Sequence, residues 1–274
     1  MVMIFDIAMP LTLLLVTLVA MFLSQKAGAK LKSSLEEREM TTRDVVFLAA
    51  GMAIVISIIA FVPQMAIMAL FLFSYASLLF MISYVFSNQR WYVAIVPPAT
   101  FLLLYMVLRD TTLWSDYLVN VYGLVFAILI ILYMGGIFTW KTTLIFGGII
   151  TALDIVLVLV TGAMITSLNQ TMSLKLPVVV QVPIIPPIIV GGRWAPMTLG
   201  LGDFFFAGLL AIQTWKRFGR KTALLSAVGM AISFFAFTTF LLNYGPSYFP
   251  GTLMIVCGWI PIALIGLRSK SGNP

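Results

Sequence analysis

Two aspartates, Asp154 and Asp203, lie inside long apolar runs of this 274-residue chain. A carboxylate at the centre of a membrane helix costs roughly 2.5–3.5 kcal/mol to insert, so a retained one indicates a function. Two carboxylates in one poorly solvated site cannot both ionise, and they share a proton. The ionised member of such a pair can activate water while the protonated member polarises a peptide carbonyl. The pair therefore predicts acid–base hydrolysis of a peptide bond.

The spacing of the two aspartates from flanking lysines predicts that they lie at one depth. Asp154 follows Lys141 by 13 residues, and Asp203 precedes Lys216 by 13 residues. At 1.5 Å per residue, each carboxylate lies roughly 20 Å from the same membrane boundary. Antiparallel neighbouring helices would thus bring both to one level. A single intramembrane aspartate is as often a packing hydrogen bond or an ion ligand, and only the matched pair favours catalysis.

Asp203 closes the tetrapeptide Gly200-Leu201-Gly202-Asp203. The two glycines remove side chains beside the carboxylate, which would let a partner helix or a substrate backbone approach closely. The tetrapeptide is short and arises easily by chance in a glycine-rich membrane protein. It gains meaning only together with Asp154.

Composition limits the chemistry further. The chain is 62% hydrophobic and 9% charged, with a mean hydropathy of +1.11, which is typical of a polytopic membrane protein. It contains no histidine and a single cysteine, Cys257. This excludes a Ser-His-Asp triad, an HExxH zinc site and a histidine-ligated haem, and we expect neither a metal nor a cofactor. The net charge of +7 comes from basic residues at the ends of apolar segments, so no nucleic-acid partner is expected.

The apolar segments predict an all-α polytopic membrane protein with one integral-membrane domain over residues 1–274. A spanning helix needs about 20 mostly apolar residues. A polar segment at 24–44 reads as a solvated connecting helix or loop, and only Pro63 and Gln64 separate the second and third spans. The nine expected spans are 4–24, 45–62, 64–87, 91–108, 116–137, 142–163, 197–215, 222–243 and 250–267.

The distribution of basic residues predicts the orientation in the membrane. Of the 16 lysines and arginines, only Arg109, Lys175 and Arg193 fall on the side opposite the 24–44 loop, which leaves 13 on the side of that loop. Cytoplasmic loops carry the excess of positive charge. We therefore expect a cytoplasmic C-terminus and an N-terminus outside.

The segment between the two aspartates, residues 164–196, is expected to cross no membrane. Four prolines between Leu176 and Val190 forbid a regular spanning helix, and the valines and isoleucines favour extended backbone. Two interpretations stay open for Val178–Val182. The stretch either offers a strand edge to an unwound substrate or forms a loop packed on the helices.

These motifs together resemble the presenilin and signal peptide peptidase family of GxGD intramembrane aspartyl proteases, particularly its microbial presenilin-like branch. That family carries one catalytic aspartate in the sixth of nine spans, a second within GxGD in the seventh, and a Pro-Ala-Leu motif at the start of the ninth. Here Asp154 falls in the sixth expected span and Asp203 in the seventh. The stretch Pro250-Gly251-Thr252-Leu253 opens the ninth.

The resemblance implies a presenilin-like fold with Asp154 and Asp203 as the catalytic pair. It also implies that residues of the two glycine-containing motifs shape the site. Those residues are Gly200, Leu201, Gly202, Pro250, Gly251, Thr252 and Leu253.

The chain departs from the family pattern at two places. Leu153 stands where the family usually has tyrosine, and the third motif reads Pro-Gly-Thr-Leu. A competing match, Pro261-Ile262-Ala263-Leu264, begins 11 residues after Pro250, which is about 16 Å along a helix. Proline is tolerated at a helix start but removes a hydrogen bond inside one. We therefore expect Pro250, not Pro261, to mark the motif.

The sequence thus predicts an endopeptidase that cleaves transmembrane peptide segments within the lipid bilayer. The outside N-terminus resembles signal peptide peptidases, which implies type II or signal-peptide-like substrates. The alternative is a proton- or cation-coupled secondary transporter that uses the same carboxylates. Against it, the first half of the chain has no comparable intramembrane acid. Homo-oligomerisation stays open.

Overall fold

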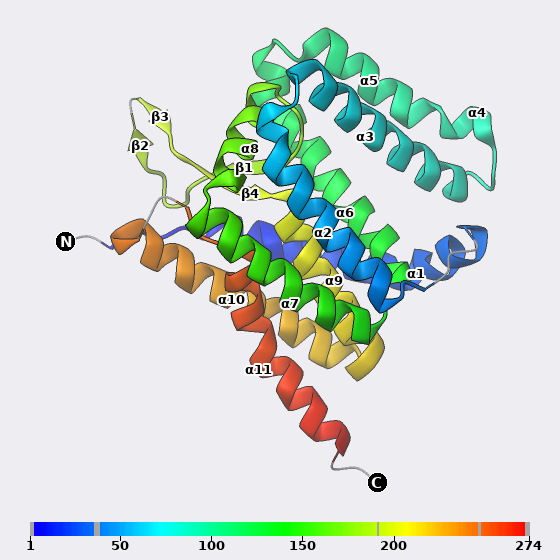
Figure 1. Cartoon of the computed structure of the whole chain (residues 1–274), viewed down its shortest axis with the longest axis vertical. Coiled ribbons are helices and arrows are strands. Elements are labelled where there is room, and N and C mark those ends of the chain that lie inside the picture. Colours follow the sequence, from blue (N-terminus) through cyan, green and yellow to red (C-terminus); the bar gives the residue numbers. More distant parts are fainter. Residues whose placement is uncertain (1–2, 36–38, 191, 246–247, 272–274) are drawn as a thin grey trace.

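The computed structural model describes residues 3–35, 39–190, 192–245 and 248–271, and most of them are helical (Figure 1). Among these described residues, seven stretches are long and apolar enough to cross a membrane, which confirms the expectation of a polytopic membrane protein. These stretches are Ala8–Lys26, Gln64–Phe86, Trp91–Leu108, Trp114–Ile137, Trp140–Val160, Arg220–Tyr244 and Gly251–Arg268. In chain order the helices are α1 (Ala8–Leu35), α2 (Thr42–Ile58), α3 (Gln64–Phe86), α4 (Trp91–Ala94), α5 (Val96–Leu108), α6 (Val119–Ile137), α7 (Trp140–Ile155), α8 (Ala163–Ser173), α9 (Leu201–Phe218), α10 (Arg220–Tyr244) and α11 (Gly251–Ser271).

Two of the nine expected spans do not meet these limits of length and hydropathy. Helix α2 has 17 residues and ends in a 3₁₀ turn before Pro63, so it is short for a span. Helix α9 has 18 residues but carries Asp203, Gln213 and Lys216, which lower its hydropathy. It also begins at Leu201 and not near residue 197, because residues 196–200 form a strand.

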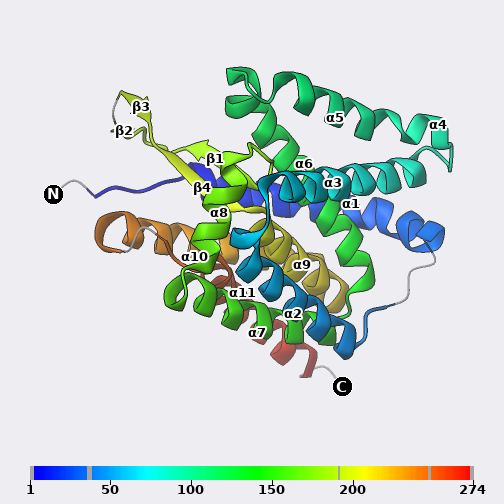
Figure 2. The same cartoon turned by 45° about the horizontal axis from the view of Figure 1, so that its top comes forward.

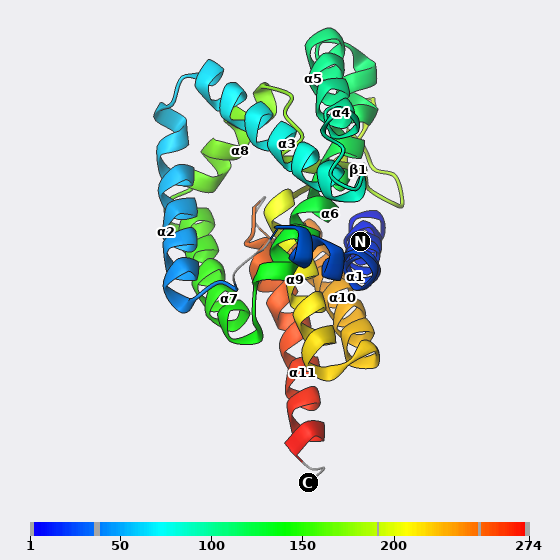
Figure 3. The ribbon, with the colours of Figure 1, turned by 90° about the vertical axis from the view of Figure 1, so that its right-hand side faces the viewer.

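Helix α9 can carry polar groups because other helices enclose it. It packs against α1, α6, α7, α10 and α11, and nearly every side chain from Phe204 to Thr214 is buried (Figure 3). A buried polar group is tolerated where it is hydrogen-bonded. The buried Gln213 amide donates to the carbonyls of Gly135 and Phe138, and the Lys216 ammonium donates to Gly135. These bonds satisfy carbonyls at the C-terminal end of α6, where cations are also favoured.

Helices α10 and α11 approach each other until their backbones touch. A Cβ atom at Gly229 would lie 2.8 Å from the carbonyl oxygen of Gly258, and one at Gly258 would overlap the carbonyl of Gly229. Only glycine permits this distance between helices. The Ser233 hydroxyl adds a bond of 2.7 Å to the Met254 carbonyl. The two helices therefore form one tightly packed pair.

Besides the helices, the segment after α8 contains short strands. Strand β1 (Val179–Pro183) pairs antiparallel with β4 (Pro196–Gly200), and β2 (Ile189–Val190) pairs with β3 (Arg193–Trp194). The β2–β3 hairpin projects from the helices in both views (Figures 1 and 2). Strand β1 thus gives Val179–Val182 the extended backbone that its valines favour, and Val178 lies just before it. None of the seven candidate spans falls in this segment.

Six aromatic residues on α3, α5, α6 and the turn that precedes α6 form a cluster against the chain that enters β1. We call Tyr75, Phe101, Tyr105, Trp114, Tyr122 and Phe126 the aromatic cluster; the Tyr75 and Phe126 rings stack with centroids 3.7 Å apart. Three of its members donate hydrogen bonds to backbone carbonyls in the segment just before β1. Tyr105 donates to Leu174 at 2.9 Å, Trp114 to Lys175 at 2.9 Å, and Tyr75 to Pro177 at 2.6 Å. The cluster therefore fixes the start of β1.

The N-terminal segment holds the far end of the same strand. Asp6 is fully buried, and its carboxylate accepts hydrogen bonds from the backbone N–H groups of Ala8, Met9 and Ile185. It thereby caps α1 and ties that helix to the chain just after β1. Strand β1 is therefore anchored at both ends by residues that lie outside the candidate site.

Candidate active site

Asp154 lies near the C-terminal end of α7. That helix starts at a capping box in which Thr139 and Thr142 satisfy each other's backbone N–H groups. Its regular part ends at Ile155, one residue after Asp154, and continues as a widened π turn over Val156–Val160. The Asp154 carboxyl group thus lies at the transition from the regular α-helix to the π turn.

Asp203 lies in the first turn of α9, directly after β4. The backbone N–H of Leu201 still donates to the carbonyl of Val178, so the sheet pairing runs into the helix start. The strand therefore fixes where α9 begins, and with it the position of Asp203 relative to the sheet. Gly200 supplies the tight exit, since a Cβ atom there would lie 3.4 Å from Oδ2 of Asp203.

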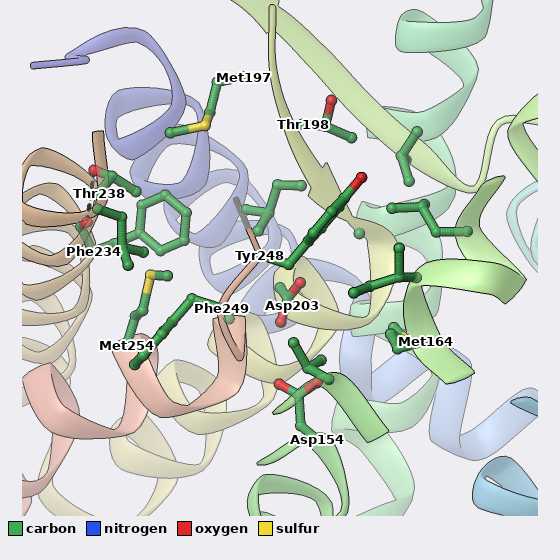
Figure 4. A pocket seen from close by; sticks show the side chains of 18 of the residues that line it. Asp154, Met164, Met197, Thr198, Asp203, Phe234, Thr238, Tyr248, Phe249 and Met254 are labelled. Carbon is green, nitrogen blue, oxygen red and sulfur yellow. Dashed lines mark hydrogen bonds between the residues drawn. The ribbon is translucent and has the colours of Figure 1, made fainter. Parts of the chain in front are cut away.

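The two aspartates meet at one cavity of about 460 Å³. Figure 4 shows both carboxyl groups facing this space, Asp154 from α7 and Asp203 from α9. A second cavity of about 80 Å³ also touches both of them, on the side of α2. Each side chain is half-buried, and the two are close enough for the charge on Asp154 to act on Asp203. The structure thus brings together the pair that their matched depth predicted.

The start of α11 completes the site. The Thr252 hydroxyl donates to Oδ2 of Asp154 at 2.6 Å, and the Thr252 backbone N–H donates to the same oxygen at 3.2 Å. A Cβ atom at Gly251 would lie 2.5 Å from Oδ1 of Asp203, so no larger residue fits without displacing that carboxyl. Neighbouring residues of one motif therefore touch the two different aspartates.

The remaining expected site residues lie around this centre with different roles. Gly202 borders the smaller cavity, and a Cβ atom there would meet nothing within 4 Å, so it leaves space beside Asp203. Leu201 is buried and lines neither cavity; Pro250 and Leu253 line neither as well. Pro250 immediately precedes α11, whereas Pro261 lies inside that helix. The structure places the 250–253 stretch, and not 261–264, at the aspartates.

Several cavity residues had no signal in the sequence. Phe234 and Thr238 come from α10, and Tyr248 from the connection to α11 (Figure 4). Each belongs to an apolar or mixed stretch with no motif of its own. The hydrogen bonds of Thr252 to Asp154 were also unexpected, although the residue itself lies in a motif.

One edge of the short sheet faces the cavity. In an antiparallel pair, hydrogen-bonded and non-hydrogen-bonded positions alternate. The bond from Leu201 to Val178 and the register Gln181↔Thr198 then direct the backbone N–H and C=O of Thr198 away from β1. The outward N–H of Gln181 on β1 is bonded to the Asn120 side chain. Thr198 on β4 lines the cavity.

Within the described residues, no group of three or more His, Cys, Asp or Glu side chains is arranged to hold a metal ion. A scan against models of known protein families and a search of curated proteins both find no match to this chain.

Proposed function

We propose that this protein is an intramembrane aspartyl endopeptidase, with Asp154 and Asp203 as its catalytic pair. The observation that supports this most directly is that two aspartates from different helices face one cavity inside a set of apolar helices. The close approach of Gly251 to Asp203 adds to it, because the third expected motif then borders the same pair.

The chemistry follows from one shared proton. The ionised carboxylate takes a proton from water as the water oxygen attacks the peptide carbonyl carbon, and the protonated carboxyl gives its proton to the carbonyl oxygen. This yields a gem-diol. The first carboxyl then protonates the amide nitrogen, the C–N bond breaks, and the second carboxylate takes a proton from one diol hydroxyl. The pair returns to its starting state.

The substrate that fits this site is an unwound transmembrane segment. The cavity is lined mostly by apolar side chains, among them Phe234, Phe249 and Met254. An extended peptide lying along β4 would find the outward N–H and C=O of Thr198 as hydrogen-bond partners beside Asp203. Two interpretations were open for Val178–Val182, a strand edge for substrate or a packed loop. The stretch falls almost entirely in β1, whose outer edge is covered by Asn120, so the edge offered to a substrate belongs to β4.

We extend the proposal to the presenilin-like fold and to the topology. All nine helices of the expected plan would then cross the bilayer, with α2 and α9 included although they are short or polar. The N-terminus would lie outside and the C-terminus in the cytoplasm, with a preference for type II segments. A reporter fused to the C-terminus and detected outside would contradict this orientation.

The test is cleavage of a transmembrane reporter peptide by the purified protein in proteoliposomes. Asp154→Ala and Asp203→Ala should each lower the rate by at least roughly 10²-fold, as expected for loss of an acid–base group. Asp116→Ala is the matched control, because Asp116 is exposed in the turn before α6, outside both cavities. Either site variant cleaving at the parental rate would rule out the pair. Uptake driven by a proton or sodium gradient, without peptide cleavage, would favour a transporter instead.

A further inference from the structure

Thr252 makes the two aspartates unequal. It donates twice to one oxygen of Asp154, through its hydroxyl at 2.6 Å and its backbone N–H at 3.2 Å. The hydroxyl distance lies in the range of hydrogen bonds from O–H to an ionised carboxylate. Thr252 is only 6% exposed, so no bulk water competes for these bonds. Facing Asp203, by contrast, is the Cα of Gly251, which comes close to the carboxyl but offers it no side-chain donor.

The helix ends act in the opposite direction and must be compared with these bonds. Asp203 lies at the N-terminus of α9, where negative charge is favoured, and Asp154 lies at the C-terminal end of α7, where it is not. A hydrogen bond to a charged group stabilises the charge by about two to three times as much free energy as a helix end does. Two such bonds converge on Asp154. The direct donors therefore outweigh the helix ends.

Resting on the proposed function, we propose that Thr252 is a positioning residue that assigns the two catalytic roles. It holds Asp154 as the ionised member, with Oδ2 occupied and Oδ1 left for the water. Asp203 then carries the shared proton and faces the substrate carbonyl. This role does not follow from the family motif, because this chain has Thr252 where that motif has an apolar residue.

Each proton then has a defined position. Oδ1 of Asp154 takes the proton of the attacking water while Asp203 protonates the carbonyl oxygen, which gives the gem-diol. Asp154 next donates that proton to the amide nitrogen as the C–N bond breaks, and Asp203 recovers a proton from the diol. Throughout, Thr252 keeps its hydroxyl proton and acts only through Asp154.

The first experiment compares Thr252→Val with Thr252→Ser in the reporter assay. Valine has nearly the same shape but no hydroxyl, so kcat should fall roughly 10- to 100-fold while KM stays within about twofold. Serine keeps the hydroxyl and should recover most of the parental kcat. The matched control is Thr17→Val, since the buried Thr17 hydroxyl has no hydrogen-bond partner among the described residues and Thr17 lines neither cavity. A valine variant at the parental rate, or a serine variant as slow as valine, would overturn the proposal.

A second experiment needs no change at Thr252, and so remains decisive if Thr252→Val does not fold. Asparagine resembles a protonated aspartic acid but cannot accept a proton from water. Asp203→Asn should therefore keep at least tenfold more residual activity than Asp154→Asn. The reverse order would overturn the assignment while leaving the endopeptidase proposal intact. A parental protein that cleaves no reporter would instead contradict the proposed function itself.

Discussion

The aromatic cluster and the candidate active site differ in the size of their side chains and in what those side chains do. The cluster fills space with large rings and uses their polar ends to bond the backbone before β1. The site is built from glycines and one threonine, which leave space and bring two carboxyl groups to one cavity. Strand β1 and its partner β4 connect the two regions. The comparison indicates that the first half of the chain stabilises the position of the sheet, while the second half carries the candidate active site.

The strongest test of this division is Gly251→Ala. The added methyl group would overlap the Asp203 carboxyl, so that carboxyl or the start of α11 must move. A displacement of about 1 Å in a catalytic group can cost 10²-fold in rate. We expect the cleavage rate to fall by about that factor, with a much smaller change in thermal stability.

The matched control is Gly148→Ala on α7, where a Cβ atom would meet nothing within 4 Å. This variant should cleave at close to the parental rate. If Gly251→Ala also retained the parental rate, the contact with Asp203 would have no bearing on catalysis.

A smaller effect is expected from Tyr75→Phe in the aromatic cluster. The ring and its stacking on Phe126 remain, but the Pro177 carbonyl loses its donor at 2.6 Å. An unsatisfied buried carbonyl costs about 1–3 kcal/mol of stability. We expect a lower unfolding temperature and less than a tenfold loss of rate for the folded protein.

Tyr92→Phe provides the comparison, because Tyr92 is exposed on α4 and its hydroxyl lies outside the cluster. It should leave stability unchanged. A Tyr75→Phe protein with normal stability but a hundredfold lower rate would show that the two regions are not separated as we describe.

The smallest effect is expected at the exposed ion pair that also holds the turn before β1. The Lys175 ammonium lies 3.1 Å from the Asp110 carboxylate, and this hydrogen bond keeps the pKa of Asp110 below its usual value near 3.8. Because the folded-state pKa is lowered, the contribution to stability is present above about pH 3.8. It is lost as the pH falls through the lower, folded-state value. Salt should weaken it.

Asp110→Asn should therefore change the unfolding temperature only slightly at neutral pH, and less at high salt. Measuring that temperature with pH and ionic strength checks this. A large, salt-independent loss would mean that the turn depends on the ion pair more than on the three aromatic donors.

Long apolar segments and the pair of aspartates could be predicted from the sequence because each rests on a local pattern. Asp154 and Asp203 met as expected, since their distances to flanking lysines already encode depth. Pro250 immediately precedes α11, as expected from the tolerance of proline at a helix start, although Pro261 lies inside the same helix. These predictions needed no knowledge of which helices pack together.

Other features depend on tertiary contacts and could not be predicted in the same way. Helix α9 falls short in hydropathy because neighbouring helices enclose its polar groups, whereas α2 is apolar and largely exposed and falls short only in length, at 17 residues. The sequence predicts a helix from residue 197, where the structure has strand β4. The pairing that makes β4 a strand joins Thr198 to Gln181, 17 residues earlier in the chain, and no local pattern indicates it. The hydrogen bonds of Tyr75 and Thr252 join residues about 100 positions apart along the chain.

The contact between Gly229 and Gly258 has a mechanical consequence for the cavity. Backbones in direct contact cannot slide past each other without separating, so α10 and α11 must move as a unit. That unit carries Gly251 on one wall of the larger cavity and Thr252 on the wall of the smaller one. Under the proposed function, the larger cavity would admit a bulky peptide by widening at the opposite wall, formed by α7, α8 and the sheet.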